Sequence, residues 1–173
     1  PREAFATAAR FPDAEVVVDW PDRYLRRVTL DARSAICVLS HDPKLDVPAL
    51  AEALAGPARY VGAMGSRRTH ADRLARLTEA GVPPEQVARL RSPIGLDLGG
   101  RSPEETALSI LAEVVACRNG ATGVPLSERS GAIHAPIDAT RREPGPGPAA
   151  PIGDEQAAGS VVADGVGAQN GRQ

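Results

Sequence analysis

Short apolar runs alternate with segments of helical period, and this alternation constrains the fold of the 173-residue chain most. Three runs predict strands because they are short, continuous and bounded by polar residues, proline or glycine: Glu15–Asp19, Ser34–Ser40 and Arg59–Met64. The first two are expected to be buried. Strands that alternate with helices form a parallel sheet with helices packed on its faces. The sequence therefore predicts the α/β class.

Two helices are predicted between and after these strands. The first begins at Asp46 and stops at Gly56, and the second has Ser66 as its N-cap and ends at Gly81. Glycine at a helix end permits the left-handed conformation that closes the last turn. Each helix carries a leucine pair that is expected on its buried face: Leu50 with Leu54, and Leu74 with Leu77.

The region after Gly81 contains a longer helix with clear boundaries. Val82–Arg91 predicts a short helix, and Ser92–Gly100 is so rich in glycine that it predicts a loop with one brief strand. Ser102–Glu105 has the pattern of a capping box with proline at the first helical position, and Asn119–Gly120 ends that helix. Its predicted buried stripe consists of Leu108, Leu111, Ala112 and Val115.

The two ends of the chain differ from its middle. From about Ala135 onward the sequence consists mainly of proline, glycine and alanine, with scattered charges and no apolar period. Such a segment cannot bury enough apolar surface to offset the entropy of ordering it. We therefore expect a folded domain over residues 1–134 and a disordered tail over residues 135–173. The chain begins at Pro1 without a methionine, so we expect a fragment of a longer sequence.

The charge balance and the cysteines exclude several classes of function. Twenty basic and 22 acidic side chains give a net charge of −2, so no global field favours nucleic acid or an anionic membrane. No run approaches the roughly 20 apolar residues that span a bilayer. Cys37 and Cys117 fit neither a disulfide framework nor the paired spacing of a zinc site. We expect a protein of the reducing cytoplasm.

Candidate functional residues follow the predicted strands. Ligands of parallel α/β sheets bind beyond the carboxyl ends of the strands. His41 and Asp42 directly follow one strand, the segment Gly62–Arg68 follows another, and Asp97 lies in the glycine-rich loop before the last helix. All three are expected on one rim. The candidate cofactor-binding residues are therefore Gly62, Ala63, Met64, Gly65, Ser66, Arg67, Arg68, His41, Asp42 and Asp97.

The turn Gly62–Arg68 is the most informative of these segments. Its glycines let the backbone approach a ligand closely, and Ser66 begins a helix whose free amides attract anions. Arg67 and Arg68 add charged donors. This pattern favours a phosphate or pyrophosphate site, although a tight strand-to-helix turn with a solvated first turn has the same pattern.

Two further positions have alternative interpretations from the residues alone. His41 beside Asp42 could pair an imidazole with a carboxylate for proton transfer, or could simply end a strand and begin a turn. Asp97 could contact a ligand hydroxyl or bond to the amides of its own loop. Cys37 lies within an apolar run, where cysteine is usually an unreactive small hydrophobe. No metal site is predicted.

Four segments together resemble the Rossmann domain of the XdhC/CoxI family, the accessory factors of xanthine dehydrogenase and carbon monoxide dehydrogenase. They are Leu39–Asp46, Tyr60–His70, Pro93–Gly99 and Ser102–Glu113, in matching order and spacing. The resemblance runs from Pro1 to about residue 134. It implies a Rossmann-like parallel sheet with flanking helices, here without its first strand–helix unit.

The resemblance also implies a function. Members of this family bind molybdenum cofactor, assist its conversion to the sulfurated form and deliver it to a molybdenum hydroxylase. They act as chaperones rather than as established enzymes. The implied cofactor is molybdopterin in its mono- or dinucleotide form, and the implied partners are a client hydroxylase, a cysteine desulfurase and a second copy of the chain. The phosphate or pyrophosphate of molybdopterin matches the anion site expected at Gly62–Arg68.

Two other functions remain as alternatives. A Rossmann domain is the usual carrier of NAD(P), and His41 could serve as proton donor in an NAD(P)-dependent oxidoreductase. The chain has no Gly-x-Gly-x-x-Gly motif, which weighs against this alternative. The other alternative is an interaction module that contacts a hydroxylase or sulfurtransferase and binds no small molecule.

Overall fold

The structure is a computed structural model that describes residue 7 and residues 9–133. The chain divides into two units, Pro1–Ser130 and Gly131–Gln173, and every helix and strand named below belongs to the first. The tail predicted over residues 135–173 lies outside the described residues. The predicted domain boundary after residue 134 therefore stays a prediction.

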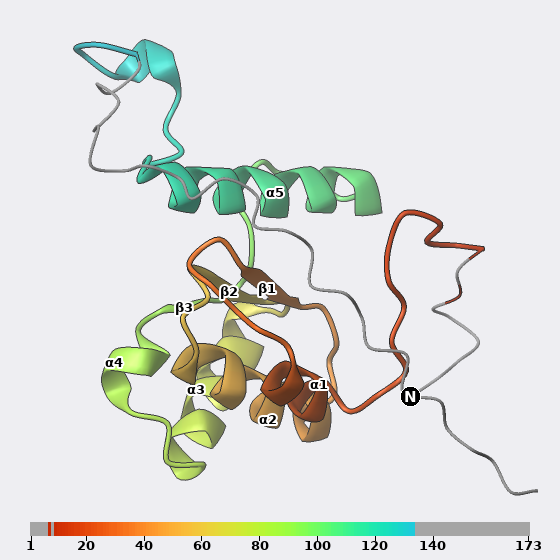
Figure 1. Ribbon diagram of the computed structural model, residues 1–173. Coiled ribbons are helices and arrows are strands. Elements are labelled where there is room, and N and C mark those ends of the chain that lie inside the picture. The colour runs from red at the N-terminus through yellow and green to blue at the C-terminus, as the bar shows by residue number, and fades with distance from the viewer. Residues whose placement is uncertain (1–6, 8, 134–173) are drawn as a thin grey trace, which may run out of the picture. The chain divides into compact units, whose positions relative to one another are not determined.

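Three parallel strands form a sheet in the order β1-β2-β3 (Figure 1). They are β1 (Ala35–Val38), β2 (Tyr60–Ala63) and β3 (Leu90–Arg91). In the register of β1 and β2, Cys37 lies beside Gly62. The second and third strands expected from the sequence are confirmed, and so is their parallel pairing.

Helices cover both faces of this sheet (Figure 1). The strand order runs in one direction, so right-handed crossovers place the helices between the strands on a single face. After β3 the chain crosses to the other face, where α5 (Pro103–Asn119) packs mainly over β2. A short 3-10 helix, η1 (Leu126–Glu128), follows α5. The helices of the first face are α1 (Pro21–Arg27), α2 (Pro43–Ala55), α3 (Arg67–Glu79) and α4 (Pro84–Val87).

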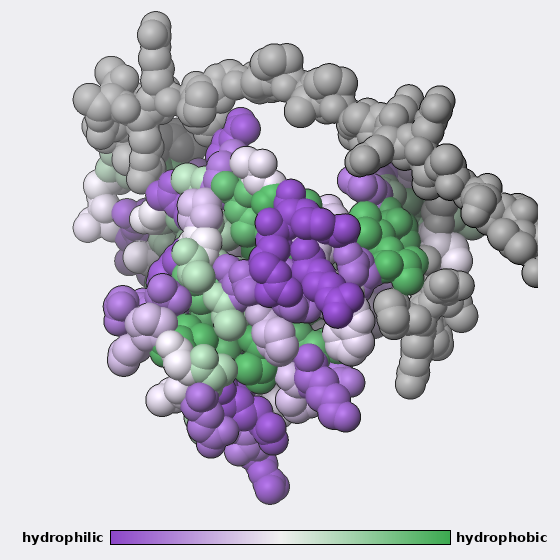
Figure 2. Space-filling model, turned by 60° about the horizontal axis from the view of Figure 1, so that its bottom comes forward, coloured by the Kyte–Doolittle hydropathy of each residue, from purple (hydrophilic) through white to green (hydrophobic). Residues whose placement is uncertain are grey.

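The apolar core lies between the sheet and helices α2 and α3. Leu50 and Leu54 of α2, Leu77 of α3 and Val61 of β2 are fully buried, and Leu74 packs against them. Leu50, Leu54 and Leu77 are therefore buried as predicted, whereas Leu74 is partly buried on the same face. On the outside of these helices, hydrophilic side chains cover most of the surface, with smaller apolar areas between them (Figure 2).

The strand predicted over Glu15–Asp19 is wrong. This segment has no regular structure, and Val17 and Val18 are 42% and 48% exposed. A strand needs a neighbour for its backbone hydrogen bonds, and within the described residues β1 pairs with β2 alone. The chain instead forms helix α1 immediately afterwards, with Pro21 at its first position.

Strand β1 is also less buried than the sequence predicts. Ile36 and Val38 pack against the core, but Ala35 and Cys37 on the opposite face are exposed. The reason is that α5 packs mainly over the neighbouring strand β2. One face of β1 therefore has no cover within the part of the chain that the structure describes.

Helix α2 begins about one turn earlier than predicted. Asp42 is its N-cap, because the Asp42 carboxylate accepts a hydrogen bond from the Lys44 amide at 3.0 Å, and Pro43 takes the first helical position. Asp46, the predicted start, lies inside the helix. Both aspartates are residues favoured at N-caps, so the local sequence does not distinguish them.

The region from residue 82 to 100 follows the prediction in part. The short helix is confirmed only for α4, because β3 occupies Leu90–Arg91 at the end of the predicted segment. Residues 92–100 contain no strand and form a loop. The brief strand thus precedes the glycine-rich loop, where it extends the sheet beside β2.

Helix α5 has the predicted boundaries but a different orientation. The Ser102–Glu105 capping box is present, and Gly120 ends the helix in the left-handed conformation. The predicted buried stripe is wrong, since Leu108 and Leu111 are each 61% exposed and Val115 is also exposed. Ile110 is instead the buried residue of this helix.

Candidate functional site

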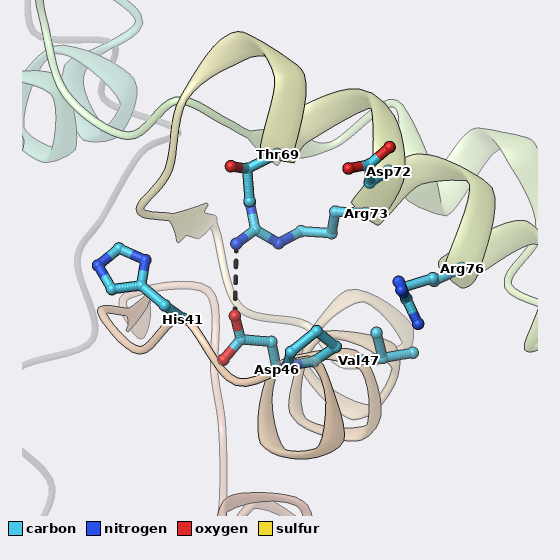
Figure 3. Close-up of a pocket in the computed structure, with 8 residues that line it drawn as sticks. His41, Asp46, Val47, Thr69, Asp72, Arg73 and Arg76 are labelled. Atoms are coloured by element: carbon cyan, nitrogen blue, oxygen red, sulfur yellow. Dashed lines mark hydrogen bonds and ion pairs between the residues drawn. The ribbon is translucent and has the colours of Figure 1, made fainter.

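A buried arginine connects the carboxyl ends of all three strands. Arg73 projects from the second turn of α3 and is 4% exposed, and Asp46 of α2 is 3% exposed. Their side chains form an ion pair with an Nη2–Oδ2 distance of 3.3 Å (Figure 3). A charge buried to this degree requires a partner and hydrogen bonds.

The remaining hydrogen bonds of this pair extend to each strand end. Arg73 donates through Nη2 to the carbonyl oxygen of Met64 at 2.8 Å, just after β2, and through Nη1 to the hydroxyl of Ser92 at 3.0 Å, just after β3. The hydroxyl of Ser40, after β1, donates to the other carboxylate oxygen of Asp46. We call Ser40, Asp46, Met64, Arg73 and Ser92 the arginine network.

A pocket of about 100 Å³ lies against this network, between the start of α2 and the first three turns of α3. Figure 3 shows Arg73 reaching from α3 toward Asp46, with His41 on one side of the pair and Arg76 on the other. Ligands of parallel sheets bind at this end of the strands. The lining residues are His41, Pro43, Asp46, Val47, Thr69, Asp72, Arg73 and Arg76.

The predicted turn Gly62–Arg68 ends beside this pocket, and the residue that follows it, Thr69, is part of the lining. Gly65 has φ of +149°, a backbone conformation that L side chains rarely adopt, and this lets the chain turn sharply out of β2. Ser66 is the N-cap of α3, and its hydroxyl accepts a hydrogen bond from the Thr69 amide at 3.1 Å. The Ser66 and Thr69 hydroxyl oxygens are 3.0 Å apart, and Thr69 lines the pocket. Arg67 and Arg68 are exposed in the first turn of α3.

Two of the predicted site residues lie within β2 itself. Gly62 and Ala63 are buried. A Cβ on Gly62 would lie 2.6 Å from the side chain of Ile94, so this glycine allows Ile94 to pack directly against the strand. Their positions serve packing between the sheet and the loop that follows β3.

The structure brings together two of the three predicted segments. His41 lines the pocket, and the adjacent Asp42 caps α2. No hydrogen bond joins His41 to Asp42 in the described structure. Asp97 is exposed in the loop before α5, where the Leu96 amide bonds to the Ser109 carbonyl at 3.2 Å, and it does not line the pocket.

The sequence prediction missed the arginine network. Asp46 lies four residues before Leu50, and Arg73 lies four residues before Leu77, so each charge continues a buried leucine stripe. A charged residue in such a position is rarely buried without a partner. Opposite charges on the stripes of two successive helices were the available signal.

The charges around the pocket nearly balance. Arg73 and Asp46 neutralise each other, and the exposed groups at the mouth are His41, Asp72 and Arg76. Among the residues that the structure describes, no group of three His, Cys, Asp or Glu side chains could hold a metal ion. The ring nitrogen Nδ1 of His70 is buried without a hydrogen-bond partner in the same part of the chain.

A second polar cluster lies on the opposite face of the sheet. The carboxylate of Glu113 in α5 accepts hydrogen bonds from the Tyr60 hydroxyl at 2.6 Å and from the Gly95 amide at 2.7 Å. Burial and then the contact with Glu113 raise the pKa of Tyr60. The Cys37 side chain is exposed overall, but partial desolvation near the sheet raises the pKa of its thiol, with a smaller contribution from the charge of Glu113. This cluster attaches α5 to the sheet.

No helix among residues 9–133 is both long and apolar enough to cross a membrane.

Comparison with known proteins identifies the family. Residues 1–114 match the XdhC Rossmann domain. Over 89 residues the chain is 38% identical to an Escherichia coli (strain K12) protein named molybdenum cofactor insertion chaperone PaoD, and this alignment covers 51% of the chain and 28% of that protein. Over 118 residues it is 30% identical to a Bacillus subtilis (strain 168) protein named as a probable xanthine dehydrogenase subunit, covering 68% of the chain and 34% of that protein.

A crystal structure described as a xanthine dehydrogenase from Bacillus halodurans is similar as well. Its TM-score is 0.55 at 31% sequence identity, and the match covers 67% of this chain and 33% of that one. The chain thus spans about a third of the length of these relatives. Because the family match includes well over half of its residues, the chain belongs to the XdhC family, with residues 1–114 in the Rossmann domain.

Proposed function

We propose that this chain is part of an accessory factor that binds molybdenum cofactor and delivers it to a molybdenum hydroxylase of the xanthine dehydrogenase or carbon monoxide dehydrogenase type. The names of the Escherichia coli and Bacillus relatives support this proposal. We further propose that the cofactor is held while a cysteine desulfurase supplies the sulfur of its sulfurated form. The role is that of a cytoplasmic chaperone.

One observation carries the proposal. The turn after β2 and the segment after β1 meet at the carboxyl end of the sheet, with a pocket between the helices that follow them. Thr69, Asp72 and Arg73 line the pocket on the side of α3, and His41 lines it on the side of α2. The Ser66 hydroxyl lies 3.0 Å from that of Thr69. This is the place where parallel α/β sheets bind phosphorylated ligands.

The dimensions of the pocket fit one end of molybdopterin. Sites that enclose a ligand of drug size measure about 300 to 1,000 Å³, whereas this pocket measures about 100 Å³. It can receive a group as small as a phosphate, while the pterin rings lie outside it. Ser66, Arg67 and Arg68 do not line the pocket, but they are exposed at the start of α3 beside it and could offer a hydroxyl and two guanidinium groups to that phosphate, in addition to the free amides of the first turn.

Binding measurements on the full-length protein test the proposal. Purified molybdenum cofactor should bind, and Arg67→Ala combined with Arg68→Ala should weaken binding by about 1 to 3 kcal/mol through loss of charge-assisted hydrogen bonds. Arg118→Ala removes an exposed arginine from the end of α5 and serves as the matched control, which should keep the wild-type affinity.

Each outcome of that experiment is decisive. Absence of cofactor binding by the wild-type protein would refute the proposal. Unchanged affinity in the Arg67/Arg68 variant would move the site away from the turn. A parallel titration with NADH and NADPH, followed by nicotinamide fluorescence, addresses the oxidoreductase alternative, which tight binding of either nucleotide would favour instead.

A further inference from the structure

We infer that Arg73 is a positioning residue, which holds the segment after β1 and the turn after β2 at a fixed separation and thereby sets the shape of the pocket. This inference rests on the proposed function for its biological meaning. Arg73 acts on the turn that carries the proposed phosphate donors through its hydrogen bond to the Met64 carbonyl. The argument depends on which elements Arg73 joins, on its burial and on its chemistry.

The partners of Arg73 come from three different segments. Met64 belongs to the turn after β2, Ser92 follows β3, and Asp46 is held in turn by Ser40 after β1. These contacts lie outside the apolar core and at the strand ends. Arg73 therefore adds side-chain bonds between segments whose backbones meet through the Met64–Val38 and Ile94–Ala63 hydrogen bonds.

The guanidinium group suits this role. It is planar, always charged and presents several N–H donors in fixed directions, so it can bond to separate acceptors at the same time. A lysine ammonium is a compact charge on a flexible stem and does not reproduce this geometry. The three acceptors of Arg73 are a carboxylate, a carbonyl and a hydroxyl, bound through its two terminal nitrogens.

The same network forms part of the pocket wall. Asp46 and Arg73 line the pocket together with His41 and Thr69. Buried ion pairs contribute little net stability compared with apolar packing of the same volume, whereas a broken pair leaves a costly unpaired charge. The Asp46–Arg73 pair therefore contributes to the site mainly by fixing the positions of the segments that it joins, and less by adding stability.

Amide hydrogen exchange of the full-length protein tests the inference. The Met64 amide bonds to the Val38 carbonyl at 2.9 Å, and the Asp46 amide bonds to the Asp42 carbonyl at 2.9 Å, so both report on the linked segments. Arg73→Lys should raise exchange at both amides by about tenfold or more, and leave the amides of α5 unchanged. Affinity for molybdenum cofactor should fall by about tenfold.

Arg76→Lys is the matched control. Arg76 belongs to the same helix and lines the same pocket, but it is exposed and makes no ion pair in the described residues. Exchange at Met64 and Asp46 should stay at the wild-type rate in this variant. A rise equal to that of Arg73→Lys would show that any change in the pocket loosens the segments, which contradicts the inference.

Other outcomes also decide the question. Unchanged exchange in Arg73→Lys, or a uniform rise that includes α5, would overturn the inference, because the role would then be absent or merely structural. If Arg73→Lys does not fold, Ser92→Ala replaces it, since it removes one hydroxyl acceptor with little change in volume. A selective rise at Met64 is then expected, and no selective rise would be contrary evidence. If the wild-type protein binds no cofactor, the proposed function is refuted, whereas the exchange measurements still test the positioning role of Arg73.

Discussion

The two faces of the sheet are covered by different means. Helices α2 and α3 bury Leu50, Leu54 and Leu77 against one face. On the other face α5 buries Ile110 but is attached through hydrogen bonds, chiefly those of Glu113. Burial of apolar surface holds the helices on the first face, and this effect has no preferred direction. Hydrogen bonds hold the helix on the second face, and they depend on direction. A few hydrogen-bonding groups can thus determine the orientation of a helix when its apolar residues do not determine it.

The largest effect is expected on the apolar face. Leu54→Ala should lower the free energy of unfolding by about 2 to 5 kcal/mol, because it removes a fully buried side chain and leaves a cavity. Leu111→Ala, the same change on the exposed side of α5, should alter it by less than about 0.5 kcal/mol. Urea denaturation measures both. Equal losses would show that the two faces do not differ in the way described.

A smaller loss is expected for the polar attachment of α5. Tyr60→Phe removes the hydrogen bond to Glu113 and should lower the free energy of unfolding by about 1 to 3 kcal/mol at neutral pH. Glu113 keeps its bond from the Gly95 amide, so α5 should remain in place. A loss well above this range, in the same urea experiment, would mean that the attachment is more cooperative than two separate hydrogen bonds.

The same variant has a signature at alkaline pH. The pKa of Tyr60 is raised in the folded protein, so the unfolded chain loses its proton first as pH rises. The stabilising contribution is complete below the ordinary tyrosine value of about 10 and is lost above it. Stability measured from about pH 8 to pH 11 should fall less steeply in Tyr60→Phe than in the wild type. Parallel curves would indicate that the phenol is not buried in this way.

The smallest of these effects is expected at the start of α5. Ser102→Ala removes the N-cap hydroxyl that accepts from the Glu105 amide and should cost about 1 kcal/mol. Hydrogen bonds from the Ser102 and Arg101 amides lower the pKa of Glu105. Its contribution is therefore present above the ordinary glutamate value and is lost as pH falls through the lowered pKa.

An acid titration checks this second property of the cap. Glu105→Gln removes the titrating group but keeps an acceptor oxygen, so the variant should lose less stability than the wild type between about pH 6 and pH 3. An identical acid loss in both proteins would show that the capping carboxylate does not respond to pH. Circular dichroism of the wild type and the variant measures the loss of helix during the titration.

Local signals made much of the fold predictable. Ser66 as an N-cap, the Ser102–Glu105 capping box and the glycine after α5 depend on hydrogen bonds between residues a few positions apart, and the structure confirms each of them. The burial of Leu54 and Leu77 follows from periodicity on a single helix. Features of this kind need no knowledge of distant segments.

Features that depend on distant partners were not predictable in the same way. The segment Glu15–Asp19 has the composition of a strand, but within the described chain it has no neighbour to pair with. Helix α5 is apolar on several sides, so periodicity alone could not show that Ile110, and not Leu111, faces the sheet. The hydrogen bond from Tyr60 of β2 to Glu113 determines which side of α5 faces the sheet, and this contact is visible only in the folded structure.

The candidate site shows the same division. The turn at Gly65 and Ser66 was predictable because its pattern is continuous along the chain, whereas the pairing of Asp46 with Arg73 joins residues 27 positions apart. The role of every residue predicted at the site stays a prediction until binding is measured. Asp97 differs from the others in position, because its loop is tied to α5 and does not border the pocket.

The outer edge of β1 has a consequence of another kind. Within the described residues that side of the strand has no neighbour, and Ala35–Val38 contains neither a charged residue nor a proline. Sheet edges of this kind recruit additional strands, and proteins usually protect them with charge, proline or a covering element. We therefore expect this edge to affect the self-association of the chain, a property that its folding stability does not determine.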